Sequence, residues 1–221
     1  MISTIIPTYN RAALLMTRAI PSVLAQAGDW ECLVVGDGTD WDTRTAMGRL
    51  CRRDRRFRFW NLPHAERPPD PMSAWASGPV ASINYGLDRA RGEWISILCD
   101  DDAYAPTHHE TLLGIADDTV DLVYGQCQRI EGDGRHTSLF GNDWRPRWND
   151  LVQGCYLLRA SLGHRADPDA WRFAGTWDAE WWNRLLPTPR YRMIYAVVSY
   201  YYPDLASMGF HDRMAAQLAG A

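Results

Sequence analysis

Short apolar runs alternate with segments of helical spacing along the first half of the chain, and this alternation limits the possible folds more than any other sequence feature. Five runs have the length of buried strands: 2–6, 31–35, 57–60, 94–99 and 122–124. The segments between them carry helical spacing or helix-start signals: 11–26, with Pro21 expected to kink it, then 43–53, 82–91 and 106–117. Strands that alternate with helices form a mainly parallel central sheet with helices on both faces, so the sequence predicts an α/β fold.

The alternation fails in two places. Residues 62–78 are predicted to form neither helix nor strand because they hold Pro63, Pro68, Pro69 and Pro71. A long irregular stretch in a compact domain is usually functional or mobile. After Thr137 the pattern is irregular and then regains a strand at 152–158, a helix at 178–186 and a strand at 191–201. The length of 221 residues suits a single domain over 1–221.

The basic residues exclude several kinds of phosphate and cofactor chemistry. All 23 lysine-or-arginine positions are arginine. A chain without lysine has no Walker-type phosphate loop, no Schiff-base lysine and no kinase strand lysine. Any phosphate must therefore be met by arginine, backbone N–H groups, a helix N-terminus or a metal ion. The net charge of -4 argues against a dedicated nucleic-acid binder.

The remaining composition predicts a cytoplasmic protein. No apolar run approaches the roughly 20 residues of a membrane span, and the N-terminus lacks the pattern of a signal peptide. The five cysteines are odd in number, widely spaced and without a CxxC pair. We interpret them as buried thiols in a reducing compartment.

Three consecutive carboxylates carry the clearest chemical signal. Asp100, Asp101 and Asp102 come directly after a buried strand. Adjacent anions raise one another's pKa unless a cation joins them, and carboxylate oxygens are suitable ligands for Mg²⁺ or Mn²⁺. The alternative is a solvated acidic turn that caps the next helix, for which Asp102 is well placed. We favour a metal site, at the strand ends where open parallel sheets bind ligands.

Three segments in register resemble the family 2 glycosyltransferases of the GT-A fold. They are IIPTYNR at 5–11, VVGDGTD at 34–40, and ARGEWI running into LCDDD over 90–102. The resemblance implies a GT-A, Rossmann-like architecture with a nucleotide-sugar-binding half (1–104) and a smaller C-terminal, acceptor-side half (105–221). The chain departs from the family pattern at Gly36 and Cys99, where an aspartate is usual, so which of the three aspartates ligate the metal stays open.

The resemblance also implies roles for individual residues. In the family, the residues that match Pro7 and Tyr9 flank the nucleotide base, and the match of Asp37 hydrogen-bonds it, commonly at a uracil N–H. The match of Asp100 lies near the ribose and that of Asp101 ligates the metal, with Asp102 as a further candidate. Arg11 is a candidate for the diphosphate. Many relatives place a histidine near the C-terminus, where this chain has Tyr202, so His211 is the substitute candidate for a metal ligand.

A second-half segment, GTWDAEWWNRL at 175–185, resembles the helix that carries the family's general base. Counting back from Arg184 puts the base at Asp178, although an aspartate at a helix start is also a common N-cap. Trp177 stands where the family has another acid. Trp177 and Trp181 are candidates for acceptor contact, because aromatic faces suit sugar rings, and core packing is the alternative.

An arginine-rich run covers the second helix and the turn after it. It comprises Arg44, Arg49, Arg52, Arg53, Arg55, Arg56 and Arg58. One interpretation is a solvated helix end. The other is a docking patch for an anionic partner such as nucleic acid or a phospholipid surface. We favour the first because the run lies away from the strand ends.

Together these features predict an inverting, metal-dependent glycosyltransferase that uses Mn²⁺ or Mg²⁺. The donor is expected to be a nucleotide-diphosphate sugar, a UDP-sugar first, and the acceptor a hydroxyl of a glycan, a small molecule, a nucleic acid or a lipid-linked compound. The alternatives are a non-catalytic nucleotide-sugar or glycan-binding module of the same fold, or a sugar nucleotidyltransferase.

Overall fold

A computed structural model describes residues 1–143, 151–172, 176–187 and 190–203 of the chain. Its strands are β1 (Ile2–Thr8), β2 (Trp30–Asp37), β3 (Phe57–Leu62), β4 (Trp94–Ile97), β5 (Ala103–Tyr104), β6 (Leu122–Ile130), β7 (His136–Phe140), β8 (Tyr156–Arg159) and β9 (Tyr191–Tyr201). Its α-helices are α1 (Ala12–Leu14), α2 (Ile20–Leu24), α3 (Trp41–Arg53), α4 (Pro71–Ser77), α5 (Val80–Leu87), α6 (His108–Leu113) and α7 (Trp177–Leu185). None of the helices within this described part is long and apolar enough to cross a bilayer.

One twisted sheet contains all of these strands. Its order is β3-β2-β1-β4-β8-β6-β9-β5, and β7 pairs with β6 outside this path. The pairs β3/β2, β2/β1, β1/β4 and β6/β9 are parallel, whereas β8, β5 and β7 pair antiparallel with their neighbours. The predicted α/β fold with a mainly parallel sheet is therefore confirmed.

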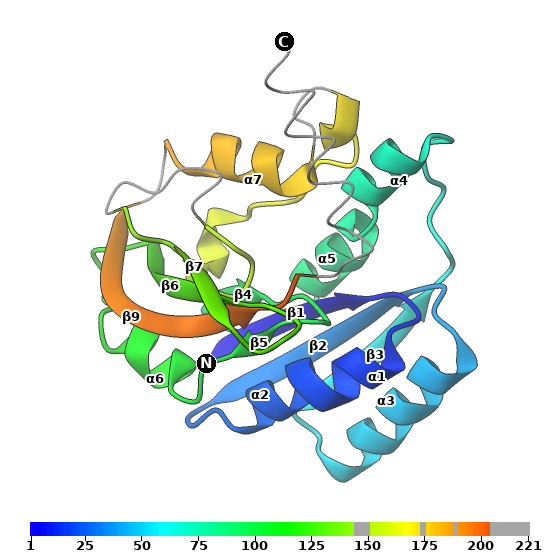
Figure 1. Cartoon of the computed structure of the whole chain (residues 1–221), viewed down its shortest axis with the longest axis horizontal. Coiled ribbons are helices and arrows are strands. Elements are labelled where there is room, and N and C mark those ends of the chain that lie inside the picture. The colour runs from blue at the N-terminus through cyan, green and yellow to red at the C-terminus, as the bar shows by residue number, and fades with distance from the viewer. Residues whose placement is uncertain (144–150, 173–175, 188–189, 204–221) are drawn as a thin grey trace.

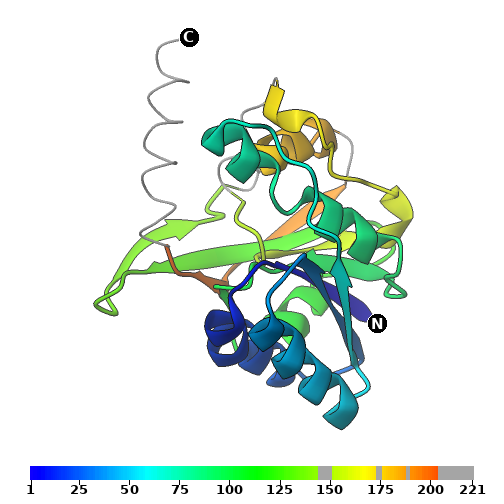
Figure 2. The ribbon, with the colours of Figure 1, turned by 90° about the vertical axis from the view of Figure 1, so that its right-hand side faces the viewer.

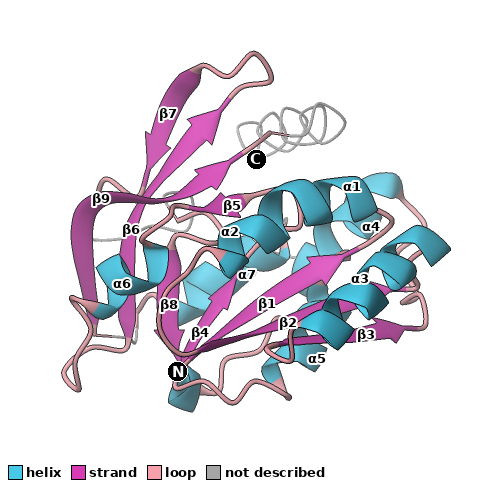
Figure 3. Cartoon of the chain, turned by 90° about the horizontal axis from the view of Figure 1, so that it is seen from below, coloured by secondary structure: helices cyan, strands magenta, loops and turns pink. Residues whose placement is uncertain are grey.

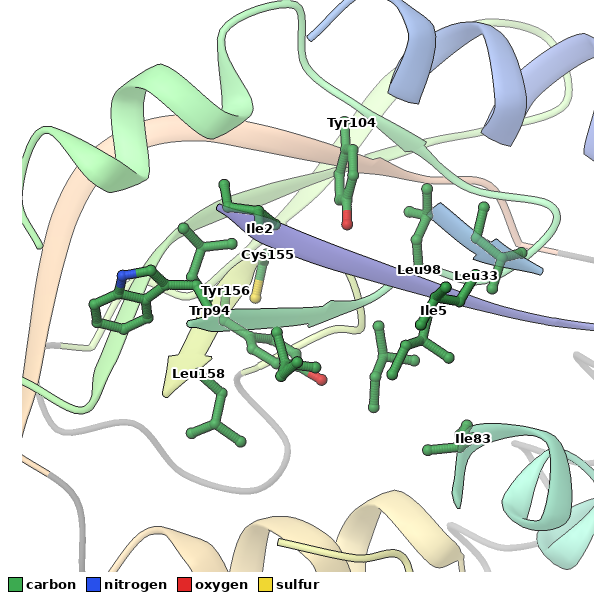
Figure 4. Packing of buried hydrophobic residues seen from close by; sticks show 14 of the residues in the cluster. Ile2, Ile5, Leu33, Ile83, Trp94, Leu98, Tyr104, Cys155, Tyr156 and Leu158 are labelled. Carbon is green, nitrogen blue, oxygen red and sulfur yellow. The ribbon is translucent and has the colours of Figure 1, made fainter. Parts of the chain in front are cut away.

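Helices cover both faces of the sheet. Figures 1 and 2 show α1, α2 and α3 on one face and α4, α5 and α7 on the other. Buried side chains fill both interfaces, and in Figure 4 Tyr104 lies on one side of β1 while Ile83 of α5 lies on the other. Apolar strands buried on both faces are typical of parallel sheets, which explains why their sequences read as continuous apolar runs.

The first helical segment differs from the predicted kink at Pro21. Residues 15–19 form a π-helical turn between α1 and α2, and all joining residues have right-handed helical backbone angles. Pro21 lies inside this continuous helical run and cannot donate a hydrogen bond to the preceding turn. The irregularity thus takes the form of a π-helical turn directly before the proline, and Arg18 of that turn reaches the Asp101 carbonyl oxygen.

Two further predictions about elements are wrong. The proline-rich stretch contains a helix, α4, which begins at Pro71 after Asp70. The Asp70 side chain accepts the Ser73 N–H at 2.9 Å as an N-cap, and proline at the first helical position is favourable. The irregular region after Thr137 begins inside β7, whose first four residues are exposed and so give no apolar signal.

Candidate functional site

The C-terminal ends of β1, β2 and β4 meet at one edge of the sheet. Thr8 at the end of β1 pairs with Gly36 of β2, and Ile5 pairs with Ile97 of β4. Side-chain bonds tie the loops that follow. Thr8 Oγ1 donates to Asp100 Oδ2 at 2.7 Å, and the Asn10 N–H donates to Thr39 Oγ1 at 2.9 Å. The three polar loops singled out in the sequence therefore form one continuous surface.

Asp37 lies at the centre of the first part of this surface. The residue is only 3% exposed, and both of its carboxylate oxygens accept hydrogen bonds. Oδ1 accepts the Ala65 N–H at 2.7 Å, and Oδ2 accepts from Arg67 Nη2 at 2.5 Å. A buried carboxylate with charge-assisted partners is held in one orientation.

Two side chains of the proline-rich stretch also cover Tyr9, which is 43% exposed. The His64 ring stacks on the Tyr9 ring with centroids 5.1 Å apart, and the Arg67 guanidinium lies 5.4 Å from the centre of that ring. His64 Nδ1 also lies 3.2 Å from Asp37 Oδ2. The sequence did not single out His64 or Arg67. The only available signal was the irregular proline-rich stretch, for which a functional role was one expectation.

Glycines allow this close approach. A Cβ on Gly36 would lie 2.7 Å from Asn61 Oδ1 and 2.7 Å from Thr39 Cγ2, and one on Gly38 would lie 2.7 Å from the His64 Cβ. Asn61 Oδ1 accepts the Thr39 N–H at 2.8 Å. The departure at Gly36 thus has a local cause, because the space of a side chain there is filled by Asn61.

Cys99, Asp101 and Asp102 form the second part of the surface. One ligand atom from each of the three lies within 4.8 Å of the others. The Asp101 carboxylate forms an ion pair with the Arg11 guanidinium, whose Nη1 is also 3.6 Å from Asp100 Oδ1. Asp102 Oδ1 accepts the Tyr202 N–H at 2.9 Å.

Burial and mutual repulsion favour the neutral forms of Asp100, Asp102 and Cys99. Burial, together with the charge of Asp101, raises the pKa of Asp100 to about 6, although the Thr8 hydroxyl and Arg11 act in the opposite direction. Burial also raises the pKa of Asp102 and of the Cys99 thiol. A divalent cation would reverse these preferences, since it favours the charged form of each ligand. Two carboxylates suit Mn²⁺ or Mg²⁺, and a thiol adds a softer ligand, so the donor set fits a divalent metal ion.

A second arginine reaches the same loop. Arg18 Nη1 donates to the Asp101 carbonyl oxygen at 3.2 Å, and its guanidinium lies 4.4 Å from the centre of the Tyr202 ring. The sequence did not single out Arg18. The π-helical turn that positions it has no signature in the apolar pattern. Pro7 lies within β1 opposite Val35, and His211 lies outside the described residues.

Asp178 begins the first turn of α7 but is not its N-cap. Thr176 is the N-cap residue, and its hydroxyl accepts the Ala179 N–H at 3.4 Å. The Asp178 Oδ1 accepts the same N–H at 3.0 Å. The charge of Asp178 is among those that raise the pKa of Cys99, so α7 begins close to the acidic loop. Because Thr176 provides the cap, capping alone does not account for Asp178.

The tryptophans of α7 are largely core residues. Trp181 is 0% exposed and packs edge-on against His164 and Trp177, and Trp182 packs against Tyr156. Trp181 has no exposed surface with which it could contact an acceptor, so it packs in the core, which was the alternative to acceptor contact. Trp177 is 8% exposed at the start of the helix.

The comparison with family models gives one match that covers most of the chain. The model described as "Glycosyl transferase family 2" matches residues 3–69 and 72–208. The matched residues include every strand of the described sheet.

Curated relatives include a "GalNAc(5)-diNAcBac-PP-undecaprenol beta-1,3-glucosyltransferase" from Campylobacter jejuni. It is 31% identical over 163 residues, which cover 73% of this chain and 49% of that protein. An uncharacterized glycosyltransferase from Rickettsia felis is 30% identical over 173 residues, covering 72% of this chain and 26% of that protein. The chain thus spans half or less of the length of these relatives.

Solved structures share the fold at low sequence identity. S. aureus TarS 1–349 in complex with UDP superposes with a TM-score of 0.70 at 16% identity, covering 100% of this chain and 66% of that one. The mannosyltransferase PcManGT from Pyrobaculum calidifontis, in complex with GDP-Man and Mn²⁺, gives 0.65 at 19% identity, covering 96% and 59%.

Proposed function

The chain belongs to glycosyl transferase family 2, and on this premise we propose that it transfers a sugar from a UDP-sugar to an acceptor hydroxyl with inversion at the anomeric carbon. The observation that carries the proposal is the meeting of three groups at one edge of the sheet: Asp37 with Tyr9, the cluster of Cys99, Asp101 and Asp102, and Asp178. They would supply a base-binding surface for the nucleotide, a charged centre for the diphosphate and a carboxylate for the acceptor.

The nucleotide would lie against Tyr9 and Asp37. Tyr9 presents a partly exposed ring on which a base can stack, with Pro7 beside it in β1. Asp37 is 3% exposed and its carboxylate is held by Ala65 and Arg67, so this carboxylate would accept an N–H of uracil in exchange for the Arg67 or His64 contact on Oδ2. Asp100, held by Thr8, would face the ribose.

Asp101 and Asp102 would hold Mn²⁺ or Mg²⁺, and the Cys99 sulfur lies within reach of the same point. When bound, the ion offsets the negative charge that develops on the departing diphosphate. Arg11 and Arg18 border this loop and add positive charge next to the diphosphate. A chain without lysine can meet the leaving charge in this way.

Asp178 would act as the general base. It lies in the first turn of α7, where the Ala179 N–H orients its carboxylate. As the acceptor oxygen bonds to the anomeric carbon, its proton passes to Asp178, and the bond between the sugar and the phosphate breaks with its electrons on the diphosphate. Trp177, next to Asp178, is the remaining candidate for acceptor contact.

A thermal-shift screen of UDP-, GDP-, dTDP- and CMP-sugars with Mn²⁺ tests the donor assignment. A ligand at 100 times its Kd adds about 2.7 kcal/mol, which in a chain of this size raises Tm by roughly 5–10 °C. We expect this shift for a UDP-sugar and its loss in Asp101→Ala. Asp178→Asn should keep the shift and slow transfer by about 10²–10⁴-fold. Full transfer activity in Asp178→Asn would contradict the base assignment, and donor binding without any nucleotide release would indicate a non-catalytic module.

A further inference from the structure

One face of the molecule carries unneutralised positive charge that the proposed chemistry does not use. Residues 40–58 contain seven arginines and three aspartates, whereas the whole chain has a net charge of -4. This segment is therefore a positive region on an otherwise acidic protein. Such a separation of charge along a chain favours a polyanionic partner at the positive end.

The structure shows which arginines are available. Arg56 pairs with Asp54, and Arg58 pairs with Glu31. Within the described residues the other five form no ion pair, and all five are exposed. Four of the five lie on α3 and one directly after it: Arg44, Arg49, Arg52, Arg53 and Arg55.

An aromatic side chain lies on the same side of α3. Trp41 is 66% exposed, the second-highest exposure among the large hydrophobic residues of the described chain. It precedes Arg52 by eleven residues, which is three helical turns, so the two point in the same direction. The buried residues of the helix, Thr43 and Met47, lie on the opposite side against the sheet. The helix therefore presents an outward side that combines arginines with one exposed indole.

The position of α3 relates this side to the sheet edge. Figures 1 and 3 show α3 as an outer helix beside α1, with no described element over its outward side. Asp40, the N-cap of α3, follows directly on the loop that carries Asp37. A flat surface in contact with the length of α3 would thus extend to the edge at which the donor is proposed to bind.

We propose that the outward side of α3 docks on the surface of an anionic phospholipid bilayer and so brings a lipid-linked acceptor to the sheet edge. This proposal rests on the proposed function for the acceptor, but the docking itself does not. Trp41 favours a bilayer over a nucleic acid, because indole rings settle at membrane–water interfaces.

The strength of this docking can be bounded. An arginine near an anionic leaflet contributes about fivefold to partitioning, so three of them contribute on the order of 100-fold. The interaction acts through solvent and is screened over about 8–10 Å at physiological salt. Binding should therefore weaken steeply as salt is raised.

Vesicle flotation of the full chain tests the proposal. The vesicles are phosphatidylcholine alone, or phosphatidylcholine with phosphatidylglycerol. We expect binding only to the anionic vesicles at low salt, and a loss on the order of 100-fold in the triple variant R49E/R52E/R53E. The control R135E/R165E/R172E makes the same change in net charge at exposed arginines elsewhere and should stay within about threefold of wild type. Trp41→Ser should weaken binding to the anionic vesicles at low salt and leave its salt dependence unchanged, because no charge is removed.

Three results would overturn the proposal: no flotation of the wild type with anionic vesicles, an equal loss in the control variant, or displacement from the vesicles by single-stranded RNA at lower concentration than by anionic lipid. Thermal melting shows whether the triple variant is folded, and Trp41→Ser tests the same surface without charge reversal. Donor thermal shifts in solution separate the two proposals. If wild type binds anionic vesicles but binds no sugar nucleotide, the proposed function is wrong and the docking proposal stands.

Discussion

At the scale of residues, two arginines hold the loop of Asp100, Asp101 and Asp102. The Asp101 carboxylate, the principal candidate metal ligand, pairs with Arg11. Arg18 approaches the backbone of the same residue rather than its carboxylate. A cation that binds Asp101 must therefore compete with the Arg11 guanidinium for the same oxygens.

Arg11→Gln should accordingly strengthen the binding of Mn²⁺ in the absence of nucleotide. Removing a unit positive charge within a few ångströms of a divalent ion favours that ion by at least about tenfold, even at a high effective dielectric constant. Titration of free Mn²⁺ by electron paramagnetic resonance measures the effect directly. Arg44→Gln removes the same charge on α3 and should leave the affinity unchanged. An Arg11→Gln variant with wild-type affinity for Mn²⁺ would show that the ion pair does not compete.

Cys99 allows a second test at the same scale. A thiolate ligand favours softer metal ions, so Co²⁺ bound at this site should show the ultraviolet absorption of thiolate-to-cobalt charge transfer. Cys99→Asp should abolish that absorption and raise the affinity for Mg²⁺ relative to Mn²⁺, because it supplies a hard oxygen ligand. Unchanged absorption of the Co²⁺ complex in Cys99→Asp would place the sulfur outside the coordination sphere.

The sequence identified candidate residues where the chemistry is local and missed those that depend on distant contacts. Asp37 and the three consecutive aspartates directly follow apolar strands, so their place at the sheet edge could be predicted. Arg67 and His64 reach Asp37 from about 30 residues away, across a stretch without a repeating pattern. The burial of Trp181 was also open, because a tryptophan on an amphipathic helix can lie in the core or at its border.

At the scale of elements, α6 buries two neighbouring histidines. His108 stacks on Tyr104 with ring centroids 3.8 Å apart, and His109 is 1% exposed. Burial lowers the pKa of His109 from 6.5 to about 4, and burial together with the neighbouring His109 also lowers the pKa of His108. Both rings are therefore neutral in the folded protein at neutral pH.

His109 should make the protein less stable as the pH falls. The unfolded chain takes up a proton near pH 6.5, whereas the folded chain does so only near pH 4. The contribution of His109 to the free energy of unfolding is complete above pH 6.5. It falls by about 1.4 kcal/mol per pH unit between pH 6.5 and pH 4. Asp100, with a raised pKa, has the opposite slope, so the comparison is between wild type and His109→Phe. Urea unfolding at pH 7, 6 and 5 should show that wild type loses stability relative to His109→Phe as the pH falls. A difference in unfolding free energy between the two proteins that stays constant with pH would contradict this prediction.

Element prediction succeeded where apolar periodicity was strong. The strands β1, β2 and β4 are buried on both faces and carry continuous apolar runs. β7 is an exposed strand of a hairpin, and its pairing with β6 depends on partner geometry rather than on its own residues. α4 was missed because proline was read only as a helix breaker, although Pro71 stands at the one helical position that tolerates it.

At the scale of the whole molecule, the sheet brings residues from distant parts of the chain to one edge. β1, β2 and β4 end at the same edge, and β9 returns from the C-terminal half to place the Tyr202 N–H on Asp102. The helix α7 adds Asp178 from the opposite layer to that of α3 (Figure 2). In the proposed function the two halves would share one site, so a bound ligand should affect loops from both of them.

Hydrogen exchange with UDP and Mn²⁺ should map this shared edge. The amides of Asn10, Thr39 and Ala65 bond to side chains of neighbouring loops, so they exchange through local opening of those loops. A bound nucleotide that contacts the loops opposes this opening and should slow exchange by about tenfold at 9–12, 37–40, 64–67 and 99–102. Amides of α6 that open locally lie away from the edge and should be unaffected. Asp101→Asn should remove the protection at 99–102 first, since Asp101 would hold the metal ion next to the diphosphate. Protection confined to β6 and β7 would instead place the nucleotide at the other end of the sheet and would contradict the proposed site.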